Sequence, residues 1–331
     1  MSQKAWSIVS LGEPLLRLAP PTHIQIARTA SFDVQVAGSQ FNVAANSARL
    51  GARSTFVTKL PANQLGQLVL EAARAHGVDT RHMQLIPGSR MGLTFVEFSS
   101  EPRAPVAVYD RAKSAASSIT PDDFDWESIV AGVDVAYTDG IFPGLSPNCE
   151  AACVAYVNAA KRAGCRVCFD TNYREHLWDT DKARAAFVKI LPFVDVIVVS
   201  RTIAEIVFGS SGTDEEIMRS FNSEFGCEMV LFTSREMDGL RRGGWSSKAL
   251  YKGSIVQSDP IQFEIADRYG TGDAWFSGVI HGLVTHDIEY ALDFGNALCA
   301  LAHTILGDVA SFSAEEVEAI MGGRVDLRVK R

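Results

Sequence analysis

The sequence lacks the signatures of several common protein classes. No apolar run approaches the length of a membrane span, and Met1 to Ile8 lacks a basic segment followed by an apolar core. The seven histidines form no HExxH pair, no GxGxxG follows the first expected strand, and no GxxxxGKS or GxxxxGKT is present. These absences argue against a secreted protein, a zinc protease, a dinucleotide dehydrogenase and a P-loop enzyme. We therefore expect a cytoplasmic protein.

Cysteine is also scarce, with six residues in 331. This number does not suggest a disulfide framework. Cys165 and Cys168 have CxxC spacing, but they lie in an expected strand, where residues three apart point to opposite faces. Cys149 and Cys153 could share a helical face, yet no second pair stands at ligand spacing. We predict buried apolar thiols and no protein metal site.

Positive charge is in deficit, because 39 acidic residues face 31 lysines and arginines and give a formal net charge of −8. This balance disfavours nucleic acid and acidic membrane surfaces as partners. It leaves room for a small anionic substrate held by a few arginines. With 47% hydrophobic and 21% charged residues, the composition is that of an ordinary globular protein.

Short apolar segments alternate with amphipathic ones along most of the chain. This alternation predicts an α/β fold with a mostly parallel sheet and helices on both faces, in which functional residues follow the carboxyl ends of strands. The expected strands are Ser7–Gly12, Ser54–Lys59, Val133–Thr138, Arg166–Asp170, Val194–Ser200 and Met229–Thr233. The expected helices are Asn42–Leu50, Leu65–His76, Pro147–Ala163, Thr180–Ile190, Asp214–Glu224 and Ala274–Val284.

Two segments interrupt the alternation. His23 to Val36 and Gly92 to Tyr109 show strand-like patterns with no helix between them, and they suggest antiparallel additions. We expect a small β lid formed by residues of about 13–37 and 89–112, with a decorative edge extension as the alternative. No linker, repeat or low-complexity tract divides the chain, so we expect a single domain over residues 1–331.

One motif near the C-terminus carries chemistry. Residues 267–278 read DRYGTGDAWFSG, a glycine turn that leads through Asp273 into an apolar helix. Glycine at Gly270 and Gly272 lets successive backbone amides converge on an anion at a helix start. A carboxylate beside such an anion hole suits phosphoryl transfer to a hydroxyl, because it can accept the proton of the alcohol. An ordinary capped loop-to-helix junction is the alternative.

Further motifs occur in order along almost the entire chain. They are VAGSQFN at Val36–Asn42, YDR at Tyr109–Arg111, DTNYR at Asp170–Arg174 and the GTGD turn, together with GEPL at Gly12–Leu15, Gly140–Ile141, Leu145–Pro147 and Asn172–Trp178. This ordered set resembles the ribokinase-like (PfkB) carbohydrate kinases, and within them the 2-keto-3-deoxygluconate kinases. The resemblance implies a Rossmann-like core, a β lid that also serves as a homodimer surface, and ATP and Mg²⁺ as cofactors.

The resemblance also implies roles for individual residues. Asp273 would be the catalytic base, and the amides around Gly270, Thr271 and Gly272 would form the anion hole. The substrate contacts implied by the same comparison, besides Asp273 itself, are Gly38, Gln40, Asn42, Tyr109, Arg111, Asn172 and Arg174. The implied nucleotide contacts are Ser200, Thr233, Gly239, Gly270, Gly272 and Asn296.

Arginines favour an acidic substrate. A guanidinium matches a carboxylate through two hydrogen bonds, so Arg111 and Arg174 suit the acid end of a keto-acid. Family members that act on neutral sugars usually carry an aspartate where this chain has Arg17. We read Arg17 as a cation for an acid substrate and as evidence against fructose, ribose or adenosine.

Some positions depart from the family pattern. Ala37 replaces a glycine, and Ile203 stands where a glutamate would support magnesium and phosphate, with Glu205 at the wrong offset. Only Gly239 remains of a glycine-spaced nucleotide loop that would begin near Thr233. The sequence therefore predicts an ATP-dependent kinase that converts 2-keto-3-deoxygluconate to its 6-phosphate. A kinase for a neutral sugar such as fructose and a catalytically weak sugar-binding protein remain as alternatives.

Overall fold

The computed structural model describes residues 5–22 and 24–321, so His23, the expected start of one strand-like lid segment, lies outside the described part. Its centre is a ten-stranded sheet in the order β13-β12-β11-β10-β9-β8-β1-β4-β5, with β14 paired to β12. The pairs from β11 to β5 are parallel, whereas β12 joins its three neighbours antiparallel. The mostly parallel sheet predicted from the alternation is confirmed.

Seven strands of this sheet have three to five residues, whereas β4, β11 and β12 have nine or ten. The strands are β1 (Ser7–Leu11), β4 (Arg53–Pro61), β5 (Met83–Ile86), β8 (Val135–Asp139), β9 (Arg166–Asp170), β10 (Val196–Val198), β11 (Met229–Asp238), β12 (Arg242–Tyr251), β13 (Ser254–Gln257) and β14 (Ile261–Glu264). The helices are α1 (Ser39–Arg49), α2 (Gln64–Ala75), α3 (Trp126–Val130), α4 (Pro147–Arg162), α5 (Thr180–Ile190), α6 (Arg201–Phe208), α7 (Asp214–Phe225), α8 (Thr271–Thr285), α9 (Ile288–His303) and α10 (Ala314–Met321).

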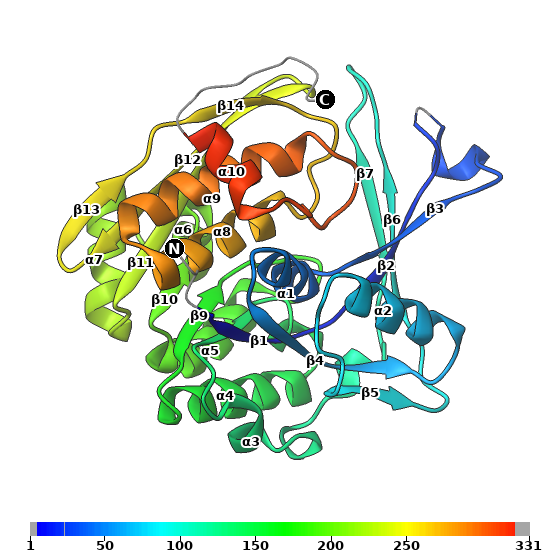
Figure 1. Ribbon diagram of the computed structural model, residues 1–331, viewed down its shortest axis with the longest axis horizontal. Coiled ribbons are helices and arrows are strands. Elements are labelled where there is room, and N and C mark those ends of the chain that lie inside the picture. Colours follow the sequence, from blue (N-terminus) through cyan, green and yellow to red (C-terminus); the bar gives the residue numbers. More distant parts are fainter. Residues whose placement is uncertain (1–4, 23, 322–331) are drawn as a thin grey trace.

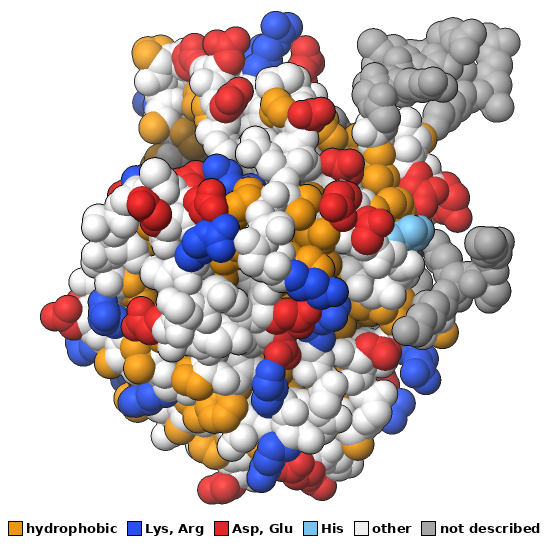
Figure 2. Space-filling model, turned by 90° about the vertical axis from the view of Figure 1, so that its left-hand side faces the viewer, with side chains coloured by type: hydrophobic (Ala, Val, Ile, Leu, Met, Phe, Trp, Pro, Cys, Tyr) orange, Lys and Arg blue, Asp and Glu red, His pale blue; other side chains and the backbone are white. Residues whose placement is uncertain are grey.

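Helices cover both faces of the sheet (Figure 1). On one face, α1, α8 and α9 bury a cluster that includes Val43, Trp275 and Leu292. On the other face, α3 to α7 bury a second cluster around Tyr156 and Phe187. No helix in residues 5–22 and 24–321 is long and apolar enough to cross a membrane. Acidic and basic side chains are interspersed on the face shown in Figure 2.

The cysteines lie in these two cores. Cys165 belongs to one cluster and Cys168 to the other, so a strand separates the two thiols onto opposite faces, as the spacing predicts. All six cysteines are free and buried. Burial raises the pKa of the Cys168 thiol to about 12, which keeps it protonated and chemically inert.

A second, four-stranded sheet stands beside the core in the order β3-β2-β6-β7 (Figure 1). Its strands are β2 (Leu15–Ala19), β3 (Asp33–Ala37), β6 (Gly92–Glu97) and β7 (Val106–Asp110). They fall in the two segments expected to form a lid. The expected pairing was antiparallel throughout, but β2 and β6 pair parallel because both strands run outward from the core. The single-domain organisation remains a prediction.

Candidate active site

A cavity of about 100 Å³ lies between the lid and the N-terminus of α8. Residues far apart in the sequence meet here because the lid, α1 and α8 converge at the carboxyl ends of the central strands. Eight of the predicted site residues line this cavity: Gly38, Gln40, Asn42, Tyr109, Arg111, Arg174, Gly270 and Asp273.

Asp273 lies in the first turn of α8 and is held by the N-terminal turn of α1. The Ser39 hydroxyl donates to Oδ1 of Asp273 over 2.7 Å, and Nδ2 of Asn42 donates to Oδ2 over 2.7 Å. Burial raises the pKa of the Asp273 carboxyl, whereas these two hydrogen bonds and the charge of Arg174 act in the opposite direction. The result is a fixed carboxylate that faces a polar cavity.

The turn before α8 depends on one of its two glycines. Gly270 caps the helix with φ of 71°, and a Cβ there would lie 1.9 Å from the carbonyl oxygen of Asp308. A Cβ at Gly272 would meet nothing within 4 Å, so the expected steric need for glycine holds only at Gly270. Thr271 anchors the turn because its hydroxyl donates to the carbonyl oxygen of Arg268 over 3.1 Å.

The start of α8 presents backbone amides at the place where the anion hole is predicted. The amide of Ala274 is the first to close the helical pattern, as it donates to the carbonyl oxygen of Gly270 over 2.8 Å. The amides of Thr271, Gly272 and Asp273 precede it and have no carbonyl acceptor within the helix. Together with the helix dipole they favour an anion beside Asp273.

Gln40 and Asn172 hold a neighbouring carboxylate, Asp139, at the end of β8. Nε2 of Gln40 donates to Oδ1 of Asp139, and Nδ2 of Asn172 donates to Oδ2 over 2.8 Å. Nδ2 of Asn172 also lies 3.1 Å from the hydroxyl of Ser39, which in turn holds Asp273. Gln40 and Asn172 were predicted to bind the substrate, but both hold Asp139. Asn172 also holds Ser39, the residue that binds Asp273.

Burial changes the acidity of the carboxyl groups at these strand ends. It raises the pKa of Asp139, although hydrogen bonds from Ser39 and Asn172 counteract the shift. Burial, with the charge of Asp139, raises the pKa of Asp170 to about 7. A chain of hydrogen-bonded polar groups thus runs from two strand ends to Asp273.

Two of the three arginines proposed for an acid substrate are already paired. Arg111 donates through Nε and Nη2 to Oε2 of the buried Glu13, over 2.7 Å for the Nε contact. Arg17 contacts Asp267 and Asp308, so its charge is already matched by protein carboxylates, and its expected role as a cation for the substrate stays a prediction. The charge of each guanidinium is matched by protein carboxylates because each is almost fully buried.

Of the three arginines that line the cavity, Arg174 is the one without an ion pair among the described residues. It is exposed, and its one hydrogen bond is from Nη1 to the carbonyl oxygen of Tyr173 over 3.3 Å. Tyr109 lies on the lid side of the cavity and stacks on His176, with ring centroids 4.7 Å apart. These side chains form a cationic and aromatic entrance to the cavity.

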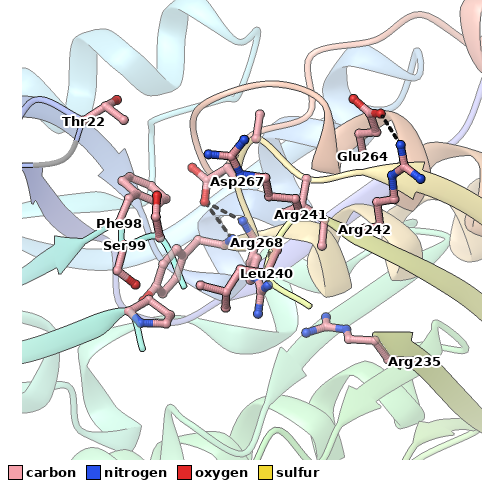
Figure 3. Close-up of a pocket in the computed structure, with 15 residues that line it drawn as sticks. Thr22, Phe98, Ser99, Arg235, Leu240, Arg241, Arg242, Glu264, Asp267 and Arg268 are labelled. Atoms are coloured by element: carbon pink, nitrogen blue, oxygen red, sulfur yellow. Dashed lines mark hydrogen bonds and ion pairs between the residues drawn. The ribbon is translucent and has the colours of Figure 1, made fainter. Parts of the chain in front are cut away.

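A larger cavity of about 720 Å³ adjoins the first across Tyr269, which lines both. Lid residues Phe98 and Ser99 form one wall, and the β11–β12 hairpin forms the other (Figure 3). Four arginines line it: Arg235, Arg241, Arg242 and Arg268. Their positive charge makes this cavity suitable for a polyanion.

The residues predicted to bind a nucleotide are spread out. Thr233 pairs with Ser247 inside the β11–β12 hairpin, and Gly239 is at the hairpin turn with φ of 69°. Strand β11 continues to Asp238, so the expected nucleotide loop is a hairpin. The Arg268 guanidinium donates to the Leu240 carbonyl oxygen over 2.7 Å and connects that turn to the GTGD segment.

Ser200 and Asn296 have structural partners. The Ser200 hydroxyl caps α6 by accepting from the amide of Ile203 over 3.2 Å. Asn296 is fully buried, and its Oδ1 accepts from the Ser247 hydroxyl over 2.8 Å and from the Trp275 indole over 3.2 Å. Neither residue lines the two cavities described above.

Whether protein side chains alone could bind Mg²⁺ depends on where the carboxylates lie. Glu205 is ion-paired with Arg201 over 2.9 Å, so it does not substitute for the glutamate missing at Ile203. Among residues 5–22 and 24–321, no group of three or more His, Cys, Asp or Glu side chains could hold a metal ion. These residues do not fit a magnesium site made by protein ligands alone.

The fold and the cavity fit a phosphotransferase with an alcohol group as acceptor, and comparison with known proteins shows this class. Residues 6–314 match the sequence model of the family described as "pfkB family carbohydrate kinase". The chain therefore belongs to the PfkB family of carbohydrate kinases.

Several similar proteins are named as kinases of dehydro-deoxy sugar acids. The chain is 31% identical to the 2-dehydro-3-deoxygalactonokinase of Haloferax volcanii, over 96% of each chain. It is 30% identical to the 2-dehydro-3-deoxygluconokinase of Thermoproteus tenax, over 95% of this chain and 94% of that one. The crystal structure of 2-dehydro-3-deoxygluconokinase from Thermotoga maritima has a TM-score of 0.93 and 33% identity, covering 98% and 100% of the two chains.

Sequence reasoning missed Ser39, Asp139 and the paired state of Arg17. The helix begins at Ser39, directly after Gly38, and not at Asn42 as predicted. With the correct start, Ser39 and Asn42 share one face of the first turn and could have been assigned to the same partner, Asp273. Asp139 ends a buried strand, which is where polar site residues collect in parallel sheets. No local signal indicated that Arg17 contacts carboxylates about 250 and 291 positions away.

Proposed function

We propose that this enzyme phosphorylates 2-keto-3-deoxygluconate, also called 2-dehydro-3-deoxygluconate, at its 6-hydroxyl with ATP as donor. The observation that carries the proposal is the placement of Asp273. Its carboxylate is fixed by Ser39 and Asn42 at the amide-rich start of α8, in a cavity that Arg174 also lines.

Each protein group has a role in the proposed reaction. Asp273 accepts the proton of the sugar hydroxyl. The hydroxyl oxygen forms a bond to the γ-phosphorus of ATP, while the bond between this phosphorus and the ADP oxygen breaks. The amides of Thr271 and Gly272 stabilise the negative charge on the phosphoryl oxygens. ATP supplies the phosphoryl group, and Mg²⁺ would arrive with its phosphates because residues 5–22 and 24–321 hold no cluster of protein ligands for it.

The arginine-lined cavity supports a polyphosphate donor. Arg268 belongs to the segment that leads into the predicted anion hole, and Arg241 lies in the hairpin turn. Arg242 begins β12 and pairs with Glu264 over 3.6 Å at the exposed edge of the cavity (Figure 3). The charges of these arginines favour the triphosphate electrostatically. Tyr269 separates this cavity from the sugar cavity, so a donor in one and an acceptor in the other would meet at the start of α8.

Substrate choice rests on Arg174. Because Arg17 and Arg111 are paired with protein carboxylates, Arg174 is the cation available to a substrate carboxylate in this cavity. The same pairing keeps a second candidate function open. A neutral sugar such as fructose would also find hydroxyl partners here, and it would not need Arg174.

We also propose that the lid mediates a homodimer. One face of the lid lines the sugar cavity through Leu15, Thr94 and Tyr109. On the opposite face, Val34 and Val108 lie in one cross-strand row through Leu18 and Phe95. Val34 is 47% and Val108 49% exposed, so this outer face presents an apolar surface that a second copy could cover.

The test of the proposed activity uses ADP release with 2-keto-3-deoxygluconate and Mg-ATP, with ³¹P NMR of the product. We expect a 6-phosphate, and we expect Asp273→Asn to lower kcat by about 10²- to 10⁴-fold, because the amide cannot accept the proton. Asp122→Asn, a change at an exposed aspartate remote from the cavity, is the matched control and keeps full activity. Wild-type turnover by Asp273→Asn would exclude Asp273 as the base.

A further inference from the structure

Arg17 is the most completely enclosed cation of the lid. It lies on β2, only 2% exposed, and its guanidinium bridges two carboxylates of the core. Nη2 donates to Oδ2 of Asp267 over 2.6 Å, and Nη1 donates to Oδ1 of Asp308. Because Asp267 and Asp308 lie on different loops, one side chain of the lid connects three segments of the chain.

Two aromatic rings enclose the same guanidinium. Its central carbon lies 5.2 Å from the ring centroid of Phe98 and 4.9 Å from that of Tyr269. Phe98 follows lid strand β6, whereas Tyr269 directly precedes Gly270. Cation–π attraction therefore adds to the ion pairs and joins the lid to the GTGD segment from both sides.

Asp267 and Asp308 both shape the turn that carries the anion hole. Oδ1 of Asp267 accepts from the amides of Arg268 and Tyr269 over 2.6 and 3.1 Å, and its Oδ2 accepts from the amide of Gly307 over 3.0 Å. The carbonyl of Asp308 packs directly against Gly270, where no Cβ would fit. The partners of Arg17 are thus the residues that fix the backbone at the start of α8.

We propose that Arg17 is a positioning residue for phosphoryl transfer, which clamps the lid to the GTGD segment and neutralises two carboxylates next to the anion hole. Without its charge, Asp267 and Asp308 would leave negative charge beside the place where phosphoryl oxygens must bind. Without the planar guanidinium, the lid would lose the hydrogen bonds that connect it to the two carboxylates beside the GTGD turn. The proposal requires the phosphotransferase activity, but it does not depend on which sugar is the acceptor.

The alternative role for Arg17 is direct recognition of a substrate carboxylate, since it also borders the sugar cavity. The two roles differ in their kinetic effects. A residue that positions the anion hole acts on kcat for every acceptor, whereas a substrate contact acts mainly on KM for acids.

The experiment compares Arg17→Met and Arg17→Lys with Arg81→Met, a control in which an exposed arginine outside the lid loses its ion pair with Asp79. Amide hydrogen exchange is measured on the free enzyme, and kcat and KM are measured with the best acceptor. For Arg17→Met we expect faster exchange in residues 15–19 and 266–271, at least a tenfold lower kcat and a KM within about threefold of wild type. Arg17→Lys should fall between these values and wild type, and Arg81→Met should match wild type.

A double-mutant cycle with Asp308→Asn completes the test. If Arg17 and Asp308 act as a pair, Asp308→Asn costs less activity in the Arg17→Met background than in wild type. Wild-type exchange and kcat in Arg17→Lys, additive effects in the cycle, or a change confined to KM for acids would each overturn the proposal. If Arg17→Met does not fold, the exchange and kcat of Arg17→Lys decide. Because exchange is measured without substrates, the result is independent of whether the sugar-acid assignment holds.

Discussion

Asp273 owes its position and charge to two donors on another helix. A serine hydroxyl and an asparagine amide each donate to one of its oxygens, and both come from the first turn of α1. Such hydrogen bonds favour the ionised carboxylate, which is the form that can accept a proton. Burial acts in the opposite direction and raises its pKa. The ability of Asp273 to act as a base therefore depends on the balance between these effects.

Removal of either donor should shift the pH dependence of the reaction. In Ser39→Ala and Asn42→Ala one hydrogen bond to the ionised form is lost, so the pKa of Asp273 rises. Because the base must be ionised, the acidic limb of the pH profile of kcat/KM then moves to higher pH. We expect kcat/KM near neutral pH to fall about tenfold, the effect of losing a charge-assisted hydrogen bond. Acidic limbs that coincide with wild type in both variants would contradict this account.

Residue positions were predictable where a motif fixes the backbone, whereas contacts with partners distant in the sequence were not. Asp273 and Gly270 lie as the GTGD motif indicated. Gln40 lines the cavity and Asn172 does not, and both side chains bind Asp139, a residue that no motif contains. Long-range pairing between charged groups depends on tertiary structure, and the sequence pattern does not encode it locally.

At the scale of elements, the onset of α8 is the feature on which the site depends. The left-handed conformation of Gly270 turns the chain into the helix, and its contact with Asp308 leaves no space for a side chain. Gly272 is the second residue of α8, and there is open space where its Cβ would be. The two glycines of one motif therefore differ in their physical roles.

A pair of alanine substitutions tests this difference. Gly270→Ala should lower the melting temperature by several degrees, because strain at positive φ adds to a clash with backbone, whereas Gly272→Ala should stay within about one degree of wild type. Thermal unfolding followed by circular dichroism provides the measurement. Equal melting temperatures for the two variants would show that the turn adapts to a side chain.

Element prediction failed chiefly at the β11–β12 hairpin. Residues 233–239 contain Ser, Arg, Glu and Asp, which favour a loop by composition, but β11 extends to Asp238 through ten paired positions with β12. Cross-strand hydrogen bonding outweighed local propensity there. Arg166–Asp170 and Thr180–Ile190 were predicted with their observed bounds, because apolar runs with clear flanking signals define both.

At the scale of the whole molecule, the lid has two different faces. Its inner face borders the sugar cavity, and its outer face carries exposed apolar side chains. In the proposed dimer, burial of the outer face would hold the strands that form the inner one. Assembly and active-site geometry would then depend on the same small sheet.

The dimer proposal predicts an assembly with twice the 35.9 kDa mass of the chain. Val108→Glu should shift it to monomers, because a buried carboxylate without a partner is strongly unfavourable in an apolar interface. Val188→Glu on α5 is the control, since Val188 is 43% exposed but distant from the lid. Light scattering coupled to size-exclusion chromatography measures the mass. A monomeric wild-type chain at micromolar concentration would refute the dimer.

The central claim is that the enzyme selects a sugar acid through Arg174. The most direct measurement is kcat/KM for 2-keto-3-deoxygluconate and for fructose, in wild type, in Arg174→Met and in the exposed control Arg81→Met. We predict at least a hundredfold preference of wild type for the acid. Arg174→Met should reduce kcat/KM for the acid about tenfold or more and leave the value for fructose unchanged, as expected for loss of a charge-assisted contact. A wild-type enzyme that phosphorylates fructose as efficiently as the acid, or an Arg174→Met variant that retains the full preference, would contradict the account.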